Sequence, residues 1–163
     1  GLVATLDTPV LRRTFEQLNL PACCEVLGEQ PTIVVDGAHN ASASASLSST
    51  IRSIRDGRRT VLLISLPQEK EVDKIIRHLA GTEAGHAIFT RYPENRAAAP
   101  QELAAIWRSC TQATTEVVTD PAEAFQKAIR EAGPQGLVVV TGSLDLGGYC
   151  RPLAEPVASN AVG

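Results

Sequence analysis

The sequence of 163 residues has no methionine, not even at position 1. A natural chain begins with methionine unless it is removed, so we expect a piece of a longer protein; processing of a short natural protein is the alternative. No apolar run approaches the length of a transmembrane helix, and no signal peptide is visible. The sequence therefore predicts no membrane partner. Its length suits one domain with a sizeable core.

Cysteines are few and form no C-x-x-C pair; they are Cys23, Cys24, Cys110 and Cys150. This spacing indicates neither a zinc site nor a thioredoxin motif. A domain with an adequate core needs no disulfides, so we expect reduced thiols in the cytoplasm.

The net charge is small: 15 basic and 18 acidic residues nearly balance and leave −3. The basic residues are scattered, which argues against a broad surface for nucleic acid. The densest basic group is expected to decorate the end of one helix, and consists of Arg52, Arg55, Arg58 and Arg59.

Apolar, β-branched runs alternate with segments of helical periodicity along the chain. The predicted strands are 24–27, 32–35, 60–65, 87–90, 116–119 and 137–140. The predicted helices are 8–18, 41–54, 71–79, 101–110 and 121–132. This alternation predicts an α/β domain with a mainly parallel sheet, helices on both faces and right-handed crossovers. We expect the domain to span 1–155 and the unpatterned tail 156–163 to be disordered.

The standard nucleotide fingerprints are absent: there is no Walker A sequence, and no G-x-G-x-x-G follows the first strand. Ligands of open α/β sheets nevertheless bind beyond the carboxyl ends of the strands. Two polar clusters follow such ends. The first contains Asp36, His39 and Asn40, and the second contains Thr141, Gly142 and Ser143.

These side chains suit a site for a charged small molecule. Asp36 could accept ribose hydroxyls or meet a cation, while His39 and Asn40 lie where a helix N-terminus favours anions. Ser143 offers a hydroxyl and an N–H. Structural roles explain the same spacing equally well, because Asp36 and Asn40 could cap the helix and an isolated histidine at a turn is commonly solvated.

The order of four short stretches resembles one family. Asp36-Gly37-Ala38-His39-Asn40 resembles the DGAHN signature of the folylpolyglutamate and dihydrofolate synthases, members of the Mur ligase superfamily. Their closing TGSLY segment is similar to 141–144, their T-R-x-x-x-x-R-A stretch to 90–97, and 120–124 also matches in order. The resemblance covers roughly residues 20–151.

The resemblance implies a Rossmann-like C-terminal domain of an ATP-dependent ligase that adds L-glutamate to dihydropteroate or folate through an acyl phosphate. ATP and Mg²⁺ would be needed, with the P-loop and metal sites in a separate N-terminal domain and none in this chain. Asp36 would bind the ribose of ATP, and Asn40 would also contact the nucleotide. His39 would be catalytic, near the phosphates and the incoming glutamate. Ser143 would help hold glutamate, and the isolated chain would be inactive.

Departures from the family pattern keep two alternatives open: a Mur-type peptidoglycan amino-acid ligase domain, and a divergent non-catalytic α/β binding module. Cys23 stands where the family has an arginine that contacts ATP phosphates, and a thiol does not replace a guanidinium. Asp145 replaces the tyrosine of the closing segment. Lys70 and Arg91 could supply a substitute cation, although we favour solvated surface charges for both.

Overall fold

The computed structural model describes residues 24–68, 71–93 and 95–159. The predicted helix 8–18, the arginine-replacing Cys23 and the candidate cation Lys70 lie outside the described residues. Within these residues, six strands form one sheet in the order β1-β2-β6-β3-β4-β5. They are β1 (Glu25–Glu29), β2 (Thr32–Asp36), β3 (Thr60–Ile64), β4 (His86–Phe89), β5 (Thr114–Val117) and β6 (Leu137–Thr141).

The sheet is mainly parallel, as the sequence predicts. β1 runs antiparallel to β2 at one edge, and every other neighbouring pair is parallel. Between Val26 and Gly28 the register of β1 shifts, which marks a bulge in this edge strand. The β-branched runs of β3 and β6 are buried along their whole length, because helices cover both faces.

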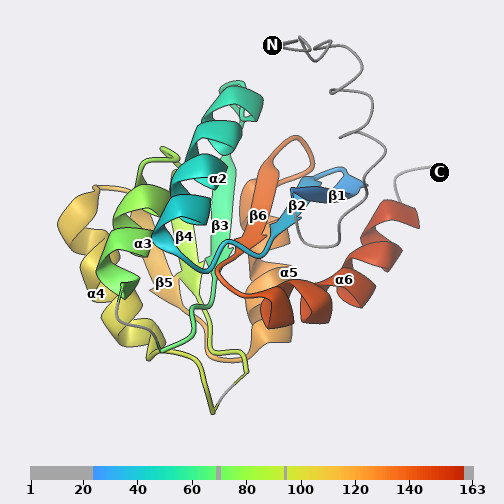
Figure 1. The fold of residues 1–163 in the computed structure, drawn as a ribbon. Coiled ribbons are helices and arrows are strands. Elements are labelled where there is room, and N and C mark those ends of the chain that lie inside the picture. Colours follow the sequence, from blue (N-terminus) through green and yellow to red (C-terminus); the bar gives the residue numbers. More distant parts are fainter. Residues whose placement is uncertain (1–23, 69–70, 94, 160–163) are drawn as a thin grey trace, which may run out of the picture.

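Two groups of helices cover the two faces of this sheet (Figure 1). One face carries α2 (Ala41–Ile54), α3 (Val72–Ala80) and α4 (Pro100–Cys110), and the other carries α5 (Pro121–Ala132) and α6 (Leu144–Ser159). Successive residues of each strand enter different cores: Val34 and Val139 pack with the first group, whereas Val35 and Val140 pack with the second. The Rossmann-like arrangement expected for the domain is therefore confirmed.

Helix ends follow the capping residues in the sequence. Asp120 accepts a hydrogen bond from the Glu123 N–H at 2.7 Å and caps α5. Gly133 ends α5 with φ +70°, a left-handed conformation that favours glycine. The bounds predicted for α2 and α5 therefore agree with the structure.

Helix α6 is the main element that the sequence prediction did not contain. Gly147, Gly148 and Pro152 lower its intrinsic helix propensity. Tertiary packing compensates, because Leu146, Cys150 and Ala154, four residues apart, enter the second core. The helix continues to Ser159, so residues 156–159 of the predicted disordered tail are helical, and 160–163 lie outside the described residues.

Strand β5 begins and ends two residues earlier than the sequence predicted. It is an edge strand whose residues are only partly buried, so polar Thr114 and Thr115 take part in the pairing with β4. The prediction was centred on the apolar residues Val117 and Val118 and therefore placed the strand too late in the sequence.

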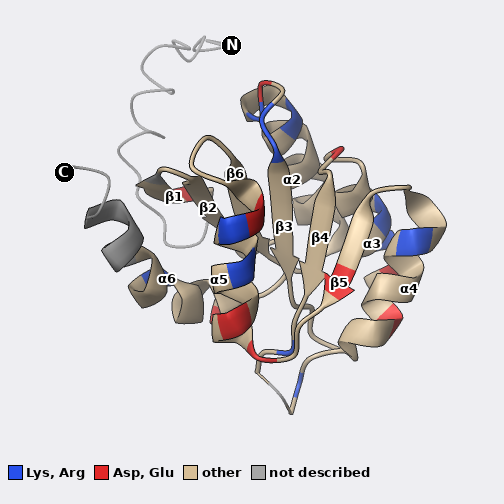
Figure 2. Ribbon diagram, turned by 180° about the vertical axis from the view of Figure 1, so that it is seen from behind, with Lys and Arg blue, Asp and Glu red and all other residues tan. Residues whose placement is uncertain are grey.

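The arginine-rich segment at the end of α2 lies at the amino-terminal end of the sheet and bonds with three other segments there. Arg55 pairs with Glu83, Arg59 pairs with Glu131 at 2.6 Å, and Arg58 donates to Thr32 Oγ1 at 2.8 Å. The expectation that this group decorates a helix end is confirmed. On the face shown in Figure 2, acidic segments lie at the two ends of α5 and basic segments lie between them. Within the described part of the chain, no helix is long and apolar enough to cross a membrane.

The order of connections leaves a crevice at the carboxyl ends of the central strands. β2 and β3 are followed by helices on one face, α2 and α3, whereas β6 is followed by α6 on the other. Adjacent strands whose connections leave in opposite directions create the crevice where ligands of such sheets bind. In register, Asp36 of β2 and Ile64 of β3 both pair with Thr141 of β6, so the three strand ends are level.

His86 is a buried titratable side chain at the opposite end of the sheet. Its Nδ1 lies 2.7 Å from Thr114 Oγ1, and that hydroxyl donates to the Gly85 carbonyl at 3.1 Å. The Thr114 oxygen therefore accepts from Nδ1–H, which leaves Nε2 without a proton in the neutral ring. Burial lowers the pKa of His86, and the carboxylate of Glu116, 3.6 Å from Nε2, only partly opposes the shift.

The lowered pKa of His86 predicts a loss of stability in mild acid. The unfolded chain binds a proton with a pKa of about 6.5, more readily than the folded chain does. The stabilisation from the neutral ring is therefore complete above this pH and is lost as the pH falls through the lower folded value. In urea titrations, the free energy of unfolding should fall more steeply below about pH 6.5 for the wild type than for His86→Asn. Parallel pH profiles would contradict this interpretation.

Candidate functional site

The loops that follow β6 and β3 touch each other at the crevice. The Ser65 N–H donates to the Thr141 carbonyl at 3.3 Å. Gly142 follows with φ +95°, and a Cβ at this position would lie 2.5 Å from the Ser65 carbonyl oxygen and 2.9 Å from Leu66 Cδ2. Only glycine therefore fits the strand-to-helix turn that brings Ser143 to the crevice.

Asp36 organises the loop after β2. One carboxylate oxygen accepts from the Ala38 N–H at 2.9 Å. The other accepts from the backbone N–H of Cys24 at 2.9 Å and from its thiol at 3.3 Å. Asp36 therefore does not cap α2, which was one of the roles left open by the sequence. It ties the start of β1 to the loop after β2, and its position is fixed.

His39 and Asn40 have different roles at the start of α2. The ring Nδ1 of His39 lies 2.9 Å from the Gly37 carbonyl, and since a carbonyl only accepts, Nδ1 carries the proton of this bond. The side-chain oxygen of Asn40 accepts from the Ala43 N–H at 2.9 Å. The capping role left open by the spacing is thus confirmed for Asn40, whereas His39 is exposed and oriented by its own loop.

Ser143 has the corresponding position at the start of α6. Its hydroxyl oxygen accepts from the N–H groups of Asp145 at 3.1 Å and of Leu146 at 3.5 Å. Ser143 is buried, with 9% of its surface exposed, so the side chain is fixed. Because the oxygen is used as an acceptor, the hydroxyl proton is the group that Ser143 offers to a ligand.

Two adjoining cavities lie over these loops. One, of about 350 Å³, is bordered by Asp36, Ala43 and Thr50. The other, of about 230 Å³, lies between the β4–α4 loop and the start of α6 and is bordered by Ser143. His39 and Leu144 line both cavities. The structure thus brings together three of the residues that the sequence singled out, while Asn40 lines neither of these two cavities.

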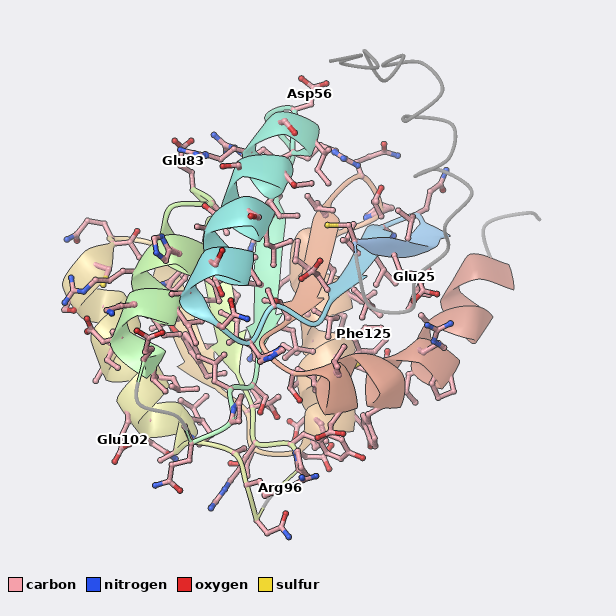
Figure 3. All side chains as sticks on the ribbon, in the orientation of Figure 1. Glu25, Asp56, Glu83, Arg96, Glu102 and Phe125 are labelled. Atoms are coloured by element: carbon pink, nitrogen blue, oxygen red, sulfur yellow. The ribbon has the colours of Figure 1, made fainter. Side chains whose placement is uncertain are left out.

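The β4–α4 loop contributes site residues from the stretch 90–97, to which the sequence analysis gave no role in the site. Tyr92 is held by Ser65, whose hydroxyl donates to the Tyr92 carbonyl at 2.9 Å and accepts from its N–H at 3.0 Å. The Tyr92 ring packs against Tyr149 of α6 at 4.7 Å between centroids. Arg96, at the lower tip of the molecule in Figure 3, lies 3.5 Å from Asp145. A signal was available, because this loop also follows the carboxyl end of a parallel strand.

Two further expectations concern cations. Arg91 is exposed and is not among the residues that line either cavity. In the described residues there is no group of three histidine, cysteine or acidic side chains that could hold a metal ion.

The fold is that of a Rossmann-like domain, and its two cavities lie at the carboxyl ends of the strands, where domains of this class bind their ligands. The sequence profile of the family described as "Mur ligase, glutamate ligase domain" matches residues 24–144, and the chain belongs to this family.

Relatives and solved structures agree with this assignment. A probable bifunctional folylpolyglutamate synthase/dihydropteroate synthase from Halobacterium salinarum is 28% identical over 141 residues, which is 86% of this chain and 17% of the relative. Folylpolyglutamate synthase from Mycobacterium tuberculosis, complexed with ADP and AMPPCP, superposes with a TM-score of 0.76 at 25% identity, over 92% of this chain and 36% of that one. For folylpolyglutamate synthase from Thermotoga maritima the TM-score is 0.72 at 26% identity, over 91% and 34%.

The close approach at Gly142 predicts a specific sensitivity. Gly142→Ala should lower the free energy of unfolding by about 2 kcal/mol or more, because it combines a left-handed backbone with a clash against the Ser65 backbone. Gly148→Ala is the matched control: its Cβ would meet nothing within 4 Å, and alanine in a helix should stabilise by up to about 1 kcal/mol. Denaturant titration of both variants checks the prediction, and equal effects would refute it.

Proposed function

We propose that the chain is the C-terminal domain of an ATP-dependent ligase that joins L-glutamate to dihydropteroate or folate. The observation that supports this most strongly is the pair of adjoining cavities with His39 between them, in a chain of the glutamate ligase domain family. Such a reaction needs a nucleotide and an amine to lie next to each other, so that an activated carboxylate can be attacked before water reaches it.

The cavity beside Asp36 is the proposed nucleotide site. Its wall contains Ala43, Leu47 and Leu144, which suit an apolar ring, and the Asp36 carboxylate suits ribose hydroxyls as an acceptor. Oδ2 accepts from the N–H and the thiol of Cys24, and Oδ1 accepts from the Ala38 N–H, which leaves a lone pair on Oδ1 for a hydroxyl donor. Asn40 would act on the nucleotide by holding the first turn of α2 in place, where N–H groups favour a phosphate.

The cavity beside Ser143 is the proposed glutamate site. The Ser143 hydroxyl would donate to the amino acid, and His39 would contact both the phosphate and the glutamate from the shared wall. Because the Nδ1–H of His39 is bonded to Gly37, Nε2 is the atom that would meet the ligands. In the protonated ring Nε2–H would donate and stabilise negative charge that develops on the phosphate side, whereas in the neutral ring Nε2 would accept from the amine.

We further propose a partner domain on the amino-terminal side that carries the P-loop and holds Mg²⁺. The chain spans about a sixth of the length of the first curated relative it matches. ATP would supply the phosphoryl group that activates the folate carboxylate. Closure of the two domains would exclude water from the activated carboxylate.

We also propose the cytoplasm as the location of the protein. The free thiols of Cys110 and Cys150 are consistent with a reducing compartment.

Replacement of His39 tests the proposed role of this residue at the wall common to the two cavities. In the full-length protein, His39→Ala should lower kcat/KM for glutamate ligation by about 100-fold, a typical loss when a charge-stabilising donor is removed. The fold should not change, because within the described residues the exposed side chain is bonded to its own loop. His78→Ala, an exposed histidine on α3, should retain full activity. Equal activity of both variants would exclude His39 from the reaction, and inactivity of the wild type would favour a binding module.

The isolated chain tests the need for a second domain. It should unfold cooperatively on heating, because its sheet has helices on both faces, yet it should form no glutamylated product from ATP, folate and glutamate. Addition of the N-terminal domain should restore product. Ligation by the isolated chain alone would overturn the two-domain proposal.

A further inference from the structure

Opposite charges from two separate elements meet at the edge of the smaller cavity. Arg96 lies in the β4–α4 loop and Asp145 in the first turn of α6, with 3.5 Å between guanidinium Nη2 and carboxylate Oδ2. Both residues line the cavity that also contains Ser143 and His39. The pair therefore lies in the cavity proposed for glutamate.

The backbone on both sides of the pair is held in place. The Arg96 N–H donates to the Pro93 carbonyl at 3.2 Å, and the Arg96 carbonyl accepts from Gln68 at 3.0 Å. The N–H of Asp145 donates to the Ser143 hydroxyl oxygen at 3.1 Å. The backbone from which the two charged side chains extend is therefore fixed, as a recognition site requires.

The pair contributes little to folding and is open to a ligand. The side chains of Arg96 and Asp145 are 72% and 54% exposed, and exposed ion pairs are worth little in water. Either charge can therefore exchange its partner for a ligand group. The attraction between each charge and the ligand group becomes stronger when a covering domain removes water from the site.

We propose that Arg96 and Asp145 recognise the two charges of a free α-amino acid, with Arg96 binding a carboxylate and Asp145 binding the α-ammonium group. This inference rests on the proposed ligase function and names the amino-acid contacts of its glutamate site. Neighbouring opposite charges complement a zwitterion, whose own opposite charges are also neighbours. Ser143 supplies a hydroxyl donor in the same cavity.

The same arrangement would let the site discriminate between the amino acid and the two other ligands, the nucleotide and the folate. Nucleotide and folate carry negative charges without an ammonium group. The start of α6 and Arg96 would attract any anion, but Asp145 offsets both positive features. A purely anionic ligand therefore meets a like charge, whereas an amino acid gains a second ion pair, so specificity comes from repulsion as well as attraction.

Variants of the full-length protein test the assignment, with ATP, Mg²⁺ and a folate acceptor supplied. Arg96→Gln and Asp145→Asn should each raise the KM for glutamate about tenfold or more, which is the loss expected for a hydrogen bond to a charged group. The KM for ATP should change by less than about twofold. Arg77→Gln and Asp73→Asn remove a comparable exposed ion pair on α3, 2.7 Å between charged atoms, and should behave as the wild type.

Glutarate, which is glutamate without its amino group, separates recognition from a merely structural role. As an inhibitor it should bind Asp145→Asn more tightly than the wild type, although glutamate binds this variant more weakly. A lower KM for glutamate in Asp145→Asn would show that Asp145 competes with the substrate for Arg96, and would overturn the ammonium contact. An unchanged KM in both variants, with an active wild type, would overturn the inference and leave the ligase intact. If the wild type ligates nothing, the ligase proposal fails, and calorimetric titration of glutamate into the same variants decides the inference.

Discussion

The parallel pairing of β6 with β2 on one side and β3 on the other positions Asp36, His39 and Ser143, the candidate ligand-binding residues that follow β2 and β6. The register levels the ends of the three strands, so Asp36 and Ser143 emerge from neighbouring loops. The pairing continues past the strand end, where the Ser65 N–H reaches the Thr141 carbonyl and Gly142 passes against the Ser65 backbone. A wider separation of β6 and β3 would part the β4–α4 loop from α6 and open the cavity between them.

Local chemistry explains why much of this arrangement was predictable from the sequence. The buried runs of β2, β3 and β6 are apolar because both faces are covered, and Asp120 and Gly133 mark the ends of α5. Helix α6 was missed, because its glycines and proline oppose helix formation and only burial in the second core stabilises it. The strand-end rule located Asp36, His39 and Ser143 in a shared crevice. It did not pair Arg96 with Asp145, since the contact depends on how the β4–α4 loop folds over the start of α6.

Several site residues serve the fold and the site with the same atoms, so a structural role is no argument against a functional one. Asn40 and Ser143 cap helices, and Asp36 fixes two backbone N–H groups and a thiol. Such bonds hold acceptors and donors in position before a ligand arrives, which lowers the cost of ordering them on binding. His39 differs, because among the described residues its bond to Gly37 uses Nδ1 and leaves Nε2 to meet a ligand.

The exposure of Leu144 supports the view that this surface is one half of a site. It is a large apolar residue, 57% exposed, at the wall common to both cavities, beside the exposed charges of Arg96 and Asp145. In water the charges are screened and the leucine contacts solvent, so neither contributes much to the domain itself. A covering surface would bury the leucine and strengthen the charges together. Both changes would favour the closed state that the proposed reaction needs, with His39 and Leu144 at the wall common to the two ligand cavities.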